Sequence, residues 1–466
     1  MMDGYRVAQI REAEARAIAE VGAEALMQRA AAGLATAILR QLPRAYGSHV
    51  LVVAGSGNNG GDALFAGARL AARGVQVWCW ATGESMHAAG WAALRAAGGR
   101  EVDDVAARQL LPRLDAVVDA VAGIGSRPGL DGPVAAFAQA CRELDVPVVA
   151  VDLPSGLAPE PPFGEAPHFV ADLTVTFGGY KLCQLLQPAK QACGEIELID
   201  IGLELDEPSV RVWQPDEVAA LWPRPRPVDD KYTRGVVGMD TGSVDYPGAA
   251  ILGCAGATYS GAGMVRYLGD PKVAASVLSR FPNIVTAPGR VQALVVGSGW
   301  GDRKEKGVIG RAIATGMPLV IDADGLRHLT TPGHPGVLLT PHAGELAYLL
   351  GMERTALTAD PLAAVVRAAE QTGCTVLLKG ATQYVATPGV ATVQVAVAGP
   401  AWTAQAGSGD VLAGICGTLL AAGLKPVTAA VLAASAQAMV AARHRGPIPP
   451  QELAAVLPTW IGDLEG

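Results

Sequence analysis

The stretch VLVVAGSGNNGGDALFAG, residues 50–67, joins a run of apolar residues to a helix-forming segment of small residues. Gly55, Gly57 and Gly60 within it follow the pattern G-x-G-x-x-G. Glycines allow a sharp backbone turn, and the free N–H groups at the start of the following helix attract phosphate. The stretch therefore predicts a strand, a tight turn and a helix, with a nucleotide site at the turn. The alternative is a glycine turn that only connects the two elements.

Three polar side chains, Asn58, Asn59 and Asp62, crowd the same turn. A dehydrogenase that binds NAD needs only glycine there, together with an acidic residue at the end of the next strand, about 20 residues on. The acid nearest that position, Glu84, comes a few residues late. We therefore favour a nucleotide site that requires these polar groups over the site of a dehydrogenase.

Five apolar runs in the first half of the chain alternate with helical patterns. They occupy residues 49–55, 75–81, 114–120, 146–152 and 173–179. Such runs are typical of strands that are buried on both faces of a parallel sheet. Repeated strand–helix–strand units of this kind predict a doubly wound α/β domain.

The pattern breaks off at residues 204–235, which are rich in proline and charge. The segment PRPRP at 223–227 can continue neither a helix nor a central strand. Further apolar runs follow at residues 293–299, 318–324, 336–342 and 375–380. We therefore predict two α/β domains, 1–206 and 231–466, joined by a proline-rich linker at 207–230.

The composition narrows the classes of function. Of the 466 residues, 50% are hydrophobic and 17% are charged, and the net charge is −8. A mildly acidic chain is unlike a nucleic-acid-binding protein, which presents a strongly basic face. No apolar run approaches the roughly 20 residues that span a membrane. Seven scattered cysteines without a C-x-x-C pair suit reduced thiols in a cytoplasmic protein.

Polar residues follow two other predicted strands of the first domain. Asp119 ends one strand, and Asp152 and Ser155 follow another in the segment VAVDLPSGL. Ligands of open α/β sheets bind at the carboxyl ends of the strands. Asn59, Asp119 and Ser155 would together offer the oxygen atoms that alkali or alkaline-earth ions prefer. Alternatively, each side chain caps its own turn.

The sharpest local pattern of the second domain is AQAGSGDVLAG, residues 404–414. Gly407 and Gly409 would present backbone N–H groups at a helix N-terminus, where phosphate binds. Asp410, just inside the helix, is placed to accept a proton from a hydroxyl that attacks a phosphate, as phosphoryl transfer requires. The alternative is an acidic residue that only stabilises the start of a helix.

Two more strand ends of this domain carry candidate ligands. His342 and Glu345 lie in LTPHAGEL, and Lys379 and Gly380 lie in LLKGATQ. A single histidine is as often a packed or capping residue, and a solvated lysine is the alternative for Lys379. No G-x-x-x-x-G-K-[ST] segment is present, which excludes a P-loop.

The ordered motifs GSGNNGGDAL, VVDAVAGIGSRPGLDGP and VAVDLPSGL resemble the N-terminal domain of the NAD(P)H-hydrate epimerases, over residues 5–203. The resemblance implies a Rossmann-like three-layer αβα fold and a potassium ion (K⁺) bound by Asn59, Asp119 and Ser155. It also implies a set of residues that contact the hydrated nicotinamide nucleotide. These are Asn58, Asn59, Gly60, Gly61, Asp62, Gly123, Ile124, Gly125, Ser126 and Asp152.

Asp152 is the candidate acid–base of the epimerase, because a carboxylate in a dry cleft can have a raised pKa. Three positions depart from the family pattern: Gln28, Ala63 and Ala158 replace a glutamate, a glycine and an aspartate. The carboxylate missing at position 158 bears on catalytic efficiency. In a second interpretation, the first domain binds a nucleotide without catalysis.

The second domain resembles the ADP- or ATP-dependent NAD(P)H-hydrate dehydratases, which have a ribokinase-like α/β fold. The motifs GSGWG, DADGL, TPHAGEL, LLKGAT and GSGDVLAG follow the order of that family across residues 230–460. The resemblance implies that the hydrate is contacted by Ala249, Gly301, His342 and Asp410. It implies that the adenine nucleotide is held by Lys379, Gly380, Ala381, Thr382, Gln383 and Gly409. Departures from the pattern, which leave Asp410 in place, occur at Asn283, Ser298, Trp300, Gly325 and Pro400.

Together the motifs predict a bifunctional enzyme that repairs hydrated nicotinamide cofactors. The first domain would interconvert the R and S forms of NADHX and NADPHX. The second would phosphorylate the hydroxyl of the S form with ADP or ATP and Mg²⁺, with Asp410 as base, so that phosphate leaves and the dihydronicotinamide is restored. A ribokinase-like small-molecule kinase is the alternative. We expect a homo-oligomer that binds no nucleic acid and no membrane.

Overall fold

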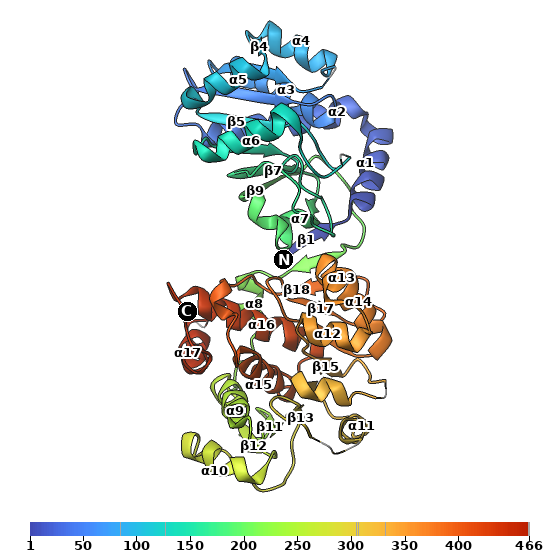
Figure 1. Cartoon of the computed structure of the whole chain (residues 1–466), viewed down its shortest axis with the longest axis vertical. Coiled ribbons are helices and arrows are strands. Elements are labelled where there is room, and N and C mark those ends of the chain that lie inside the picture. The colour runs from blue at the N-terminus through green and yellow to red at the C-terminus, as the bar shows by residue number, and fades with distance from the viewer. Residues whose placement is uncertain (84, 126, 304, 306, 331, 465–466) are drawn as a thin grey trace. The chain divides into compact units, whose positions relative to one another are not determined.

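The computed structural model describes residues 1–464 except residues 84, 126, 304, 306 and 331. Glu84 and Ser126, which the sequence singled out, therefore lie outside the described residues. The chain divides into two compact units, one of Asp3–Ser209 and the other of Val210–Gly466 together with Met1–Met2. Each unit contains a core of strands with helices packed against them (Figure 1).

The N-terminal unit is built on a seven-stranded parallel sheet with the order β4-β3-β2-β5-β6-β7-β9. Its strands are β2 (His49–Ala54), β3 (Gln76–Ala81), β4 (Arg100–Val102), β5 (Ala116–Ala120), β6 (Val148–Val151), β7 (Leu173–Phe177) and β9 (Glu195–Ile199). The five apolar runs expected as strands are thus confirmed. In addition, β1 (Met2–Tyr5) pairs in parallel with β8 (Tyr180–Lys181).

Helices cover both faces of this sheet. They are α1 (Val7–Val21), α2 (Ala23–Gln41), α3 (Asn58–Ala71), α4 (Ala88–Ala96), α5 (Asp104–Leu110), α6 (Gly132–Glu143) and α7 (Leu182–Leu185). Helices α2, α3 and α4 share a hydrophobic core with one face, and α5 and α6 share a second core with the other (Figure 1). The expected three-layer αβα fold is therefore confirmed.

The strand order reverses at the glycine turn after β2. From β2 the chain moves outward to β3 and β4, then returns to β5 on the other side of β2 and continues to β6 and β7. In a doubly wound sheet, a crevice for ligands forms outside the carboxyl ends of the strands at such a reversal. The turn at residues 55–57 lies at this crevice.

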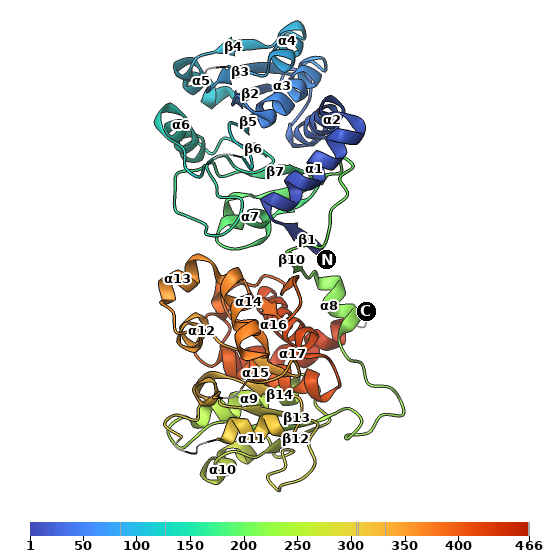
Figure 2. The ribbon, with the colours of Figure 1, turned by 90° about the vertical axis from the view of Figure 1, so that its right-hand side faces the viewer.

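Strands of the C-terminal unit are hydrogen-bonded in the order β12-β11-β13-β14-β15-β16-β17-β18-β10. Figure 2 shows β12, β13 and β14 of this unit together with α9, α10 and α11. Neighbours are parallel except at β17, which is antiparallel to both β16 and β18. The strands are β10 (Val210–Val212), β11 (Val236–Asp240), β12 (Met264–Tyr267), β13 (Ala293–Val296), β14 (Leu319–Ile321), β15 (Val337–Leu339), β16 (Thr375–Leu378), β17 (Tyr384–Ala386) and β18 (Val393–Val395). The four apolar runs expected here form β13 to β16.

A large hydrophobic core joins helices α9, α15, α16 and α17 to this sheet. The helices of the unit are α8 (Pro215–Leu221), α9 (Pro247–Tyr259), α10 (Pro271–Arg280), α11 (Val308–Ala314), α12 (Ala343–Leu350), α13 (Arg354–Ala359), α14 (Pro361–Thr372), α15 (Ser408–Ala421), α16 (Pro426–Ala442) and α17 (Pro450–Asp463). Among the described residues, no helix combines the length and the apolar character needed to cross a bilayer.

The segment expected as a linker, residues 207–230, differs in part from that expectation. Its strand β10 pairs with β18, and the segment around α8 buries Trp213, Val218 and Trp222 in the core of the C-terminal unit. The surrounding prolines and charges dominate the composition and conceal these spaced apolar residues. The C-terminal unit therefore begins at Val210, ahead of the proline-rich residues.

Glycines bring α9 and α15 into backbone contact. A Cβ atom on Gly414 would lie 2.1 Å from the carbonyl oxygen of Gly253, and one on Gly256 would lie 2.2 Å from that of Val411. Real Cβ atoms do not approach carbonyl oxygens this closely. The position of α15, which carries Asp410, therefore depends on these glycines.

We expect Gly414→Ala to destabilise the C-terminal unit by about 2–3 kcal/mol, because the added methyl group forces the two helices apart. Calorimetry of the full chain measures this as a lower Tm for one unfolding transition. Gly462→Ala is the control, since Gly462 lies in α17 with open space around it. The control should keep or slightly raise the Tm. An unchanged Tm in Gly414→Ala would contradict the close contact.

Candidate active sites

A cavity of about 500 Å³ opens at the carboxyl ends of β2, β5 and β6 in the N-terminal unit. Helices α1 and α2, the turn after β2 and the loop after β5 form its walls. Seven of the residues that were expected to contact the hydrate line this cavity. They are Asn58, Asn59, Asp62, Gly123, Ile124, Gly125 and Asp152. The fold thus brings together three polar segments that are far apart in the sequence.

Gly60 and Gly61, also expected at the substrate, are buried in the first turn of α3 and are not among the residues that line the cavity. A Cβ atom on Gly60 would lie 2.1 Å from the carbonyl oxygen of Gly55. Glycine at this position therefore lets the helix begin directly against the end of the strand. This gives Gly60 a structural role. Ser126 lies outside the described residues.

The three residues expected to bind potassium lie at the same edge of the sheet. Asp119 is fully buried, and its carboxylate accepts hydrogen bonds from the backbone N–H groups of Ser155 (2.7 Å) and Val121 (3.4 Å). Burial raises the pKa of Asp119 to about 6, although its hydrogen bonds act in the opposite direction. The Asn59 side chain donates its Nδ2 proton to the carbonyl oxygen of Val151 at 2.9 Å.

This set of residues fits a monovalent cation. It offers one buried carboxylate that forms no ion pair with a described residue, together with the amide oxygen of Asn59 and the hydroxyl of Ser155. Alkali ions prefer such oxygen ligands. Within the described part of the chain, no group of three or more His, Cys, Asp or Glu side chains is suited to a metal ion. A cation here would therefore depend on neutral oxygens around a single carboxylate.

The Asp152 side chain is held by a network of buried contacts. Its backbone has a φ of +70°, in the left-handed region that non-glycine residues rarely adopt. Its carboxylate forms a buried ion pair with Lys181 and accepts a hydrogen bond from the Thr176 hydroxyl at 3.3 Å. The Lys181 ammonium also donates to Thr176 Oγ1 (2.9 Å) and to the carbonyl oxygen of Phe177 (3.0 Å), so all its protons have acceptors.

Two further carboxylic acids, Asp62 and Glu14, line the cavity. Burial raises the pKa of Asp62 well above its usual value, and the negative charges of Asp152 and Glu14 raise it further. Burial and the charge of Asp152 also raise the pKa of Glu14, against the opposing charges of Lys181 and Arg11. The cavity therefore combines an ion-paired carboxylate with acids of raised pKa, an arrangement suited to proton transfer.

In the C-terminal unit, a cavity of about 1230 Å³ lies between the start of α9, the loop after β13 and the start of α15. Ala249, Gly301 and Asp410, three of the four residues expected to contact the hydrate, line it. The N–H group of Gly301 donates to the carboxylate of Asp324 at 2.9 Å, which fixes the glycine loop.

Asp410 lies in the first turn of α15, whose N-cap Gly407 has a φ of +91°. The pKa of Asp410 is raised to about 7, first by burial and next by the negative charge of Asp322, while the charge of Lys379 acts in the opposite direction. A carboxyl group with such a pKa is suited to general base catalysis near neutral pH.

Lys379 reaches the start of α15 from the end of β16. A Cβ atom on Gly409 would lie 3.2 Å from Lys379 Nζ. Nζ donates to the buried carboxylate of Asp322 at 2.8 Å, which also accepts the hydroxyls of Ser298 (2.9 Å) and Thr340 (2.8 Å). Burial lowers the pKa of Lys379, but the negative charge of Asp322 and of two further carboxylates outweighs burial, and the pKa is raised.

His342 is the fourth residue expected at the hydrate, and it is not among the residues that line this cavity. Its Nδ1 accepts hydrogen bonds from the N–H groups of Gly344 (3.0 Å) and Glu345 (3.1 Å) and so caps α12. Its backbone pairs with that of Lys379. The other residues expected to hold the nucleotide, Gly380, Ala381, Thr382 and Gln383, form the loop between β16 and β17.

Two family models match the chain. One described as NAD(P)H-hydrate dehydratase matches residues 237–458, and one described as YjeF-related protein N-terminus matches residues 23–183. The bifunctional NAD(P)H-hydrate repair enzyme Nnr of Mycobacterium leprae is 42% identical over 446 residues, which cover 91% of this chain and 90% of the relative. The chain belongs to the family of bifunctional NAD(P)H-hydrate repair enzymes.

Two further similar proteins support the assignment of this chain to the family of repair enzymes. The Nnr protein of Mycobacterium tuberculosis is 42% identical over 439 residues, covering 90% of this chain and 89% of the relative. Among solved structures, the ADP/ATP-dependent NAD(P)H-hydrate dehydratase of Bacillus subtilis, co-crystallised with ATP and Mg²⁺, is 23% identical with a TM-score of 0.51. The match covers 55% of this chain and 99% of that structure. This likeness shows the ribokinase-like fold.

Several charged groups of the two cavities were not expected from the sequence of the repair enzyme. Lys181, whose ammonium pairs with the cavity residue Asp152, lies two residues after the glycine pair 178–179, in a segment that predicts only an ordinary surface lysine. Glu14 belongs to an amphipathic helix, and Arg327 follows the DADGL motif without a pattern of its own. Asp322 could be recognised as a candidate from the sequence, because it begins that motif at a strand end. Its ion pair with Lys379 could not be predicted from the sequence.

We expect Lys181→Met to destabilise the N-terminal unit by about 3–5 kcal/mol, because the Asp152 carboxylate would remain buried without its partner. Denaturant unfolding measures this, and the double variant Lys181→Met/Asp152→Asn should recover much of the loss. Arg40→Met is the control: Arg40 is exposed in its ion pair with Glu197, and its loss should cost less than about 1 kcal/mol. Purely additive effects of the two buried substitutions would contradict a coupled pair.

Proposed function

We propose that this chain epimerises NAD(P)HX in its N-terminal unit and dehydrates the S form in its C-terminal unit with ADP or ATP. One observation carries the proposal for the second activity. The carboxyl group of Asp410, with a pKa of about 7, lies in a large cavity beside the free N–H groups of a helix start and near Lys379. The relatives that share both units are named as repair enzymes, which disfavours the small-molecule kinase alternative.

In the dehydratase step, Asp410 accepts the proton of the hydroxyl on the hydrated ring. The hydroxyl oxygen bonds to the terminal phosphorus of the nucleotide as the bond to the leaving oxygen of ADP or ATP breaks. Phosphate then departs from the ring carbon with the bonding electron pair, and a proton passes from the neighbouring carbon to water, which restores the double bond. Mg²⁺, which enters with the nucleotide, would neutralise charge on its phosphates.

Each glycine at the start of α15 has a place in this step. The N–H group of Ser408 donates to the carbonyl oxygen of Gln405 at 3.2 Å, whereas no hydrogen bond to a described residue is made by those of Gly409 and Asp410. Free N–H groups at a helix N-terminus bind phosphate. Gly409 leaves room for Lys379, whose ammonium is held by Asp322 and stays charged beside the phosphates. Asp410 is then within the same first turn as the anion site.

In the epimerase step, we assign Asp152 as the base and Asp62 as the acid. Asp152 takes the proton of the ring hydroxyl as the carbon–nitrogen bond breaks, which opens the ring to an aldehyde, and Asp62 protonates the ring nitrogen. Rotation about the carbon chain and closure on the other face give the second epimer. The ion pair with Lys181 orients Asp152, and the raised pKa of Asp62 suits a proton donor.

Potassium fits the neighbouring set Asn59, Asp119 and Ser155, where it would compensate the buried charge of Asp119. When bound, such an ion supplies a fixed positive charge and no redox or Lewis-acid step. It would order the loops after β5 and β6, which carry Gly123 and Asp152 toward the substrate. The proposed role of the ion is therefore structural.

We expect Asp410→Asn and Asp152→Asn to remove different activities. With a mixture of R and S NADHX, Mg²⁺, K⁺ and ADP or ATP, the wild type should restore all the NADH, measured by its absorbance. Asp152→Asn should stop at the S fraction, apart from spontaneous exchange. Asp410→Asn should lower the rate of NADH recovery at least about 100-fold. Asp216→Asn, at an exposed position in α8, is the control.

Two outcomes of this experiment would contradict the proposal. Full recovery of both epimers by Asp152→Asn at the wild-type rate would remove the epimerase assignment. A stable phosphorylated product without NADH in the wild type would point to a kinase instead. The better of the two nucleotides would identify the phosphate donor.

The pH dependence of dehydration provides an independent test. Asp410 must be ionised to accept a proton. Because its pKa is raised to about 7, its carboxyl group is mostly protonated below that pH. The kcat/KM for S-NADHX should therefore fall about tenfold for each pH unit below about 7 and level off above it. A kcat/KM that does not change between pH 5 and pH 7 would contradict this role of Asp410.

A further inference from the structure

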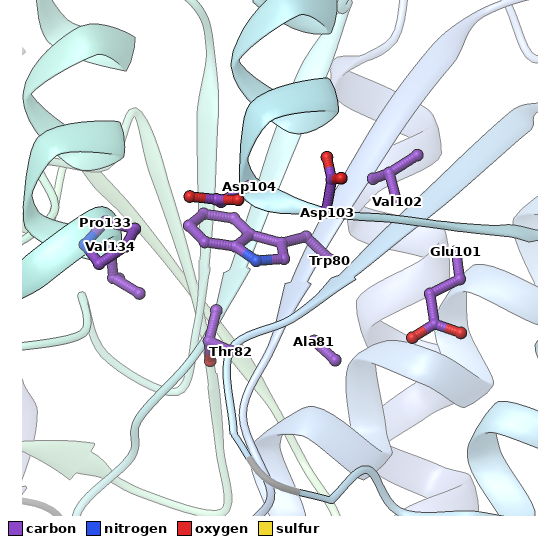
Figure 3. Close-up of a pocket in the computed structure, with 9 residues that line it drawn as sticks. All are labelled: Trp80, Ala81, Thr82, Glu101, Val102, Asp103, Asp104, Pro133 and Val134. Carbon is purple, nitrogen blue, oxygen red and sulfur yellow. The ribbon is translucent and has the colours of Figure 1, made fainter.

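A second cavity, of about 640 Å³, lies in the N-terminal unit outside the residues assigned above. Its walls come from the carboxyl ends of β3 and β4 and from the starts of α5 and α6. The lining residues are Trp80, Ala81, Thr82, Glu101, Val102, Asp103, Asp104, Pro133 and Val134. Figure 3 shows the indole of Trp80 between Pro133 and Val134 on one side and Glu101 on the other. A cavity of this volume is large enough for a nucleoside.

The two cavities of this unit are neighbours along one edge of the sheet. Ser56 lines the first and Thr82 the second. The N–H group of Thr82 donates to the carbonyl oxygen of Ala54 at 2.9 Å, and a Cβ atom on Gly83 would lie 3.4 Å from that of Ser56. In sheets with this strand order, a dinucleotide extends across the crevice, and the end of the strand next to the glycine turn receives a ribose. Here that strand is β3, which ends at the second cavity.

The largely buried indole of Trp80 gives this cavity a hydrogen-bond donor without a partner among the described residues. Trp80 is only 6% exposed, and its ring packs edge-on against Phe137 with 5.3 Å between centroids. Its ring N–H makes no hydrogen bond to any residue that the structure describes, and it is not one of the described buried atoms that lack a partner. The N–H group is therefore accessible and can donate a hydrogen bond to a ligand. An adenine base, which has ring nitrogens as acceptors and an aromatic face, matches this wall.

Apart from Thr82, whose hydroxyl donates to the carbonyl oxygen of Ala54 at 3.2 Å, the remaining polar side chains of the cavity are acidic. Glu101, Asp103 and Asp104 line it, and no lysine, arginine or histidine is among its described lining residues. Asp103 Oδ1 accepts the N–H group of Ala106 at 2.8 Å and caps α5, whereas Glu101 and Asp104 form no ion pair or hydrogen bond with a described residue. Carboxylates accept hydrogen bonds from ribose hydroxyls and repel a phosphate at the same place.

We propose that this cavity binds the adenosine half of the hydrated dinucleotide with an unphosphorylated ribose. The N-terminal unit therefore acts on NADHX in preference to NADPHX, whose additional phosphate meets the carboxylates of Glu101 and Asp104. The inference rests on the proposed epimerase function and names the substrate of that site. It predicts discrimination through KM, because the acids act on binding and lie away from the reacting ring.

The experiment uses the full chain without ADP or ATP, so that dehydration does not consume the substrate. S-NADHX or S-NADPHX is supplied, and formation of the R form is followed by chromatography after subtraction of the spontaneous rate. The wild type should show a KM for NADPHX at least about tenfold above that for NADHX, with similar kcat values. Glu101→Gln/Asp104→Asn should raise the KM for NADHX, because the charged acceptors of the ribose hydroxyls are lost, and should lower the ratio of the NADPHX KM to the NADHX KM at least about fivefold.

Two further variants separate the cavity from general effects of charge. Glu143→Gln/Glu195→Gln removes the same number of charges at exposed positions, at the end of α6 and at the start of β9, and should leave the KM ratio unchanged. Trp80→Phe keeps a ring but removes the N–H donor, so it should raise KM for both hydrates by a similar factor without changing kcat. Its unfolding midpoint shows whether the buried substitution alters folding.

Equal KM values for the two hydrates in the wild type would overturn the inference, and so would equal shifts in the acidic double variant and the control. Both results leave epimerisation itself in place. Absence of enzymatic exchange with either hydrate would instead remove the proposed epimerase function, and the inference would fall with it. The two failures are therefore distinguishable in one set of assays.

Discussion

A carboxylate that is buried at the end of a parallel strand loses its hydration, and hydrogen bonds or a cation must make up for this loss. Both units of the repair enzyme contain such a group. Asp119 accepts backbone N–H groups of its own loop and of the loop after β6, whereas Asp322 accepts Lys379 and the hydroxyls of Ser298 and Thr340. Each buried carboxylate therefore ties together loops from neighbouring strand ends, and the shapes of both cavities follow from these ties.

The two units satisfy this requirement with different charges. In the C-terminal unit, Lys379 balances Asp322, so Asp410 is left as the acid that titrates near neutral pH. In the N-terminal unit, the buried Lys181 forms its ion pair with Asp152, and Asp119 forms no ion pair with a described residue. The first arrangement suits the acceptance of one proton beside phosphates. The second suits a cation next to a site where protons are exchanged.

The sequence allowed the sheets and the turns to be predicted, because strands buried on both faces are continuous apolar runs and the glycine turns follow them directly. Contacts between distant segments gave no such pattern. Lys181 meets Asp152 through a two-residue strand, and Glu14 reaches the cavity from an amphipathic helix. In the sequence, Trp80 is only one of several apolar residues of its strand. The structure adds that its N–H group has no acceptor among the described residues. The roles of the individual site residues stay predictions.

The backbone contact between α9 and α15 also constrains how this enzyme can change over evolution. Gly256 and Gly414 admit no larger side chain without a backbone shift, so the two helices cannot vary at their point of closest contact. Tyr246 and Arg327 also line the cavity, and both are exposed, so they are not held by this contact. The start of α15 is thus fixed by close packing, whereas exposed positions that line the cavity are free of this constraint.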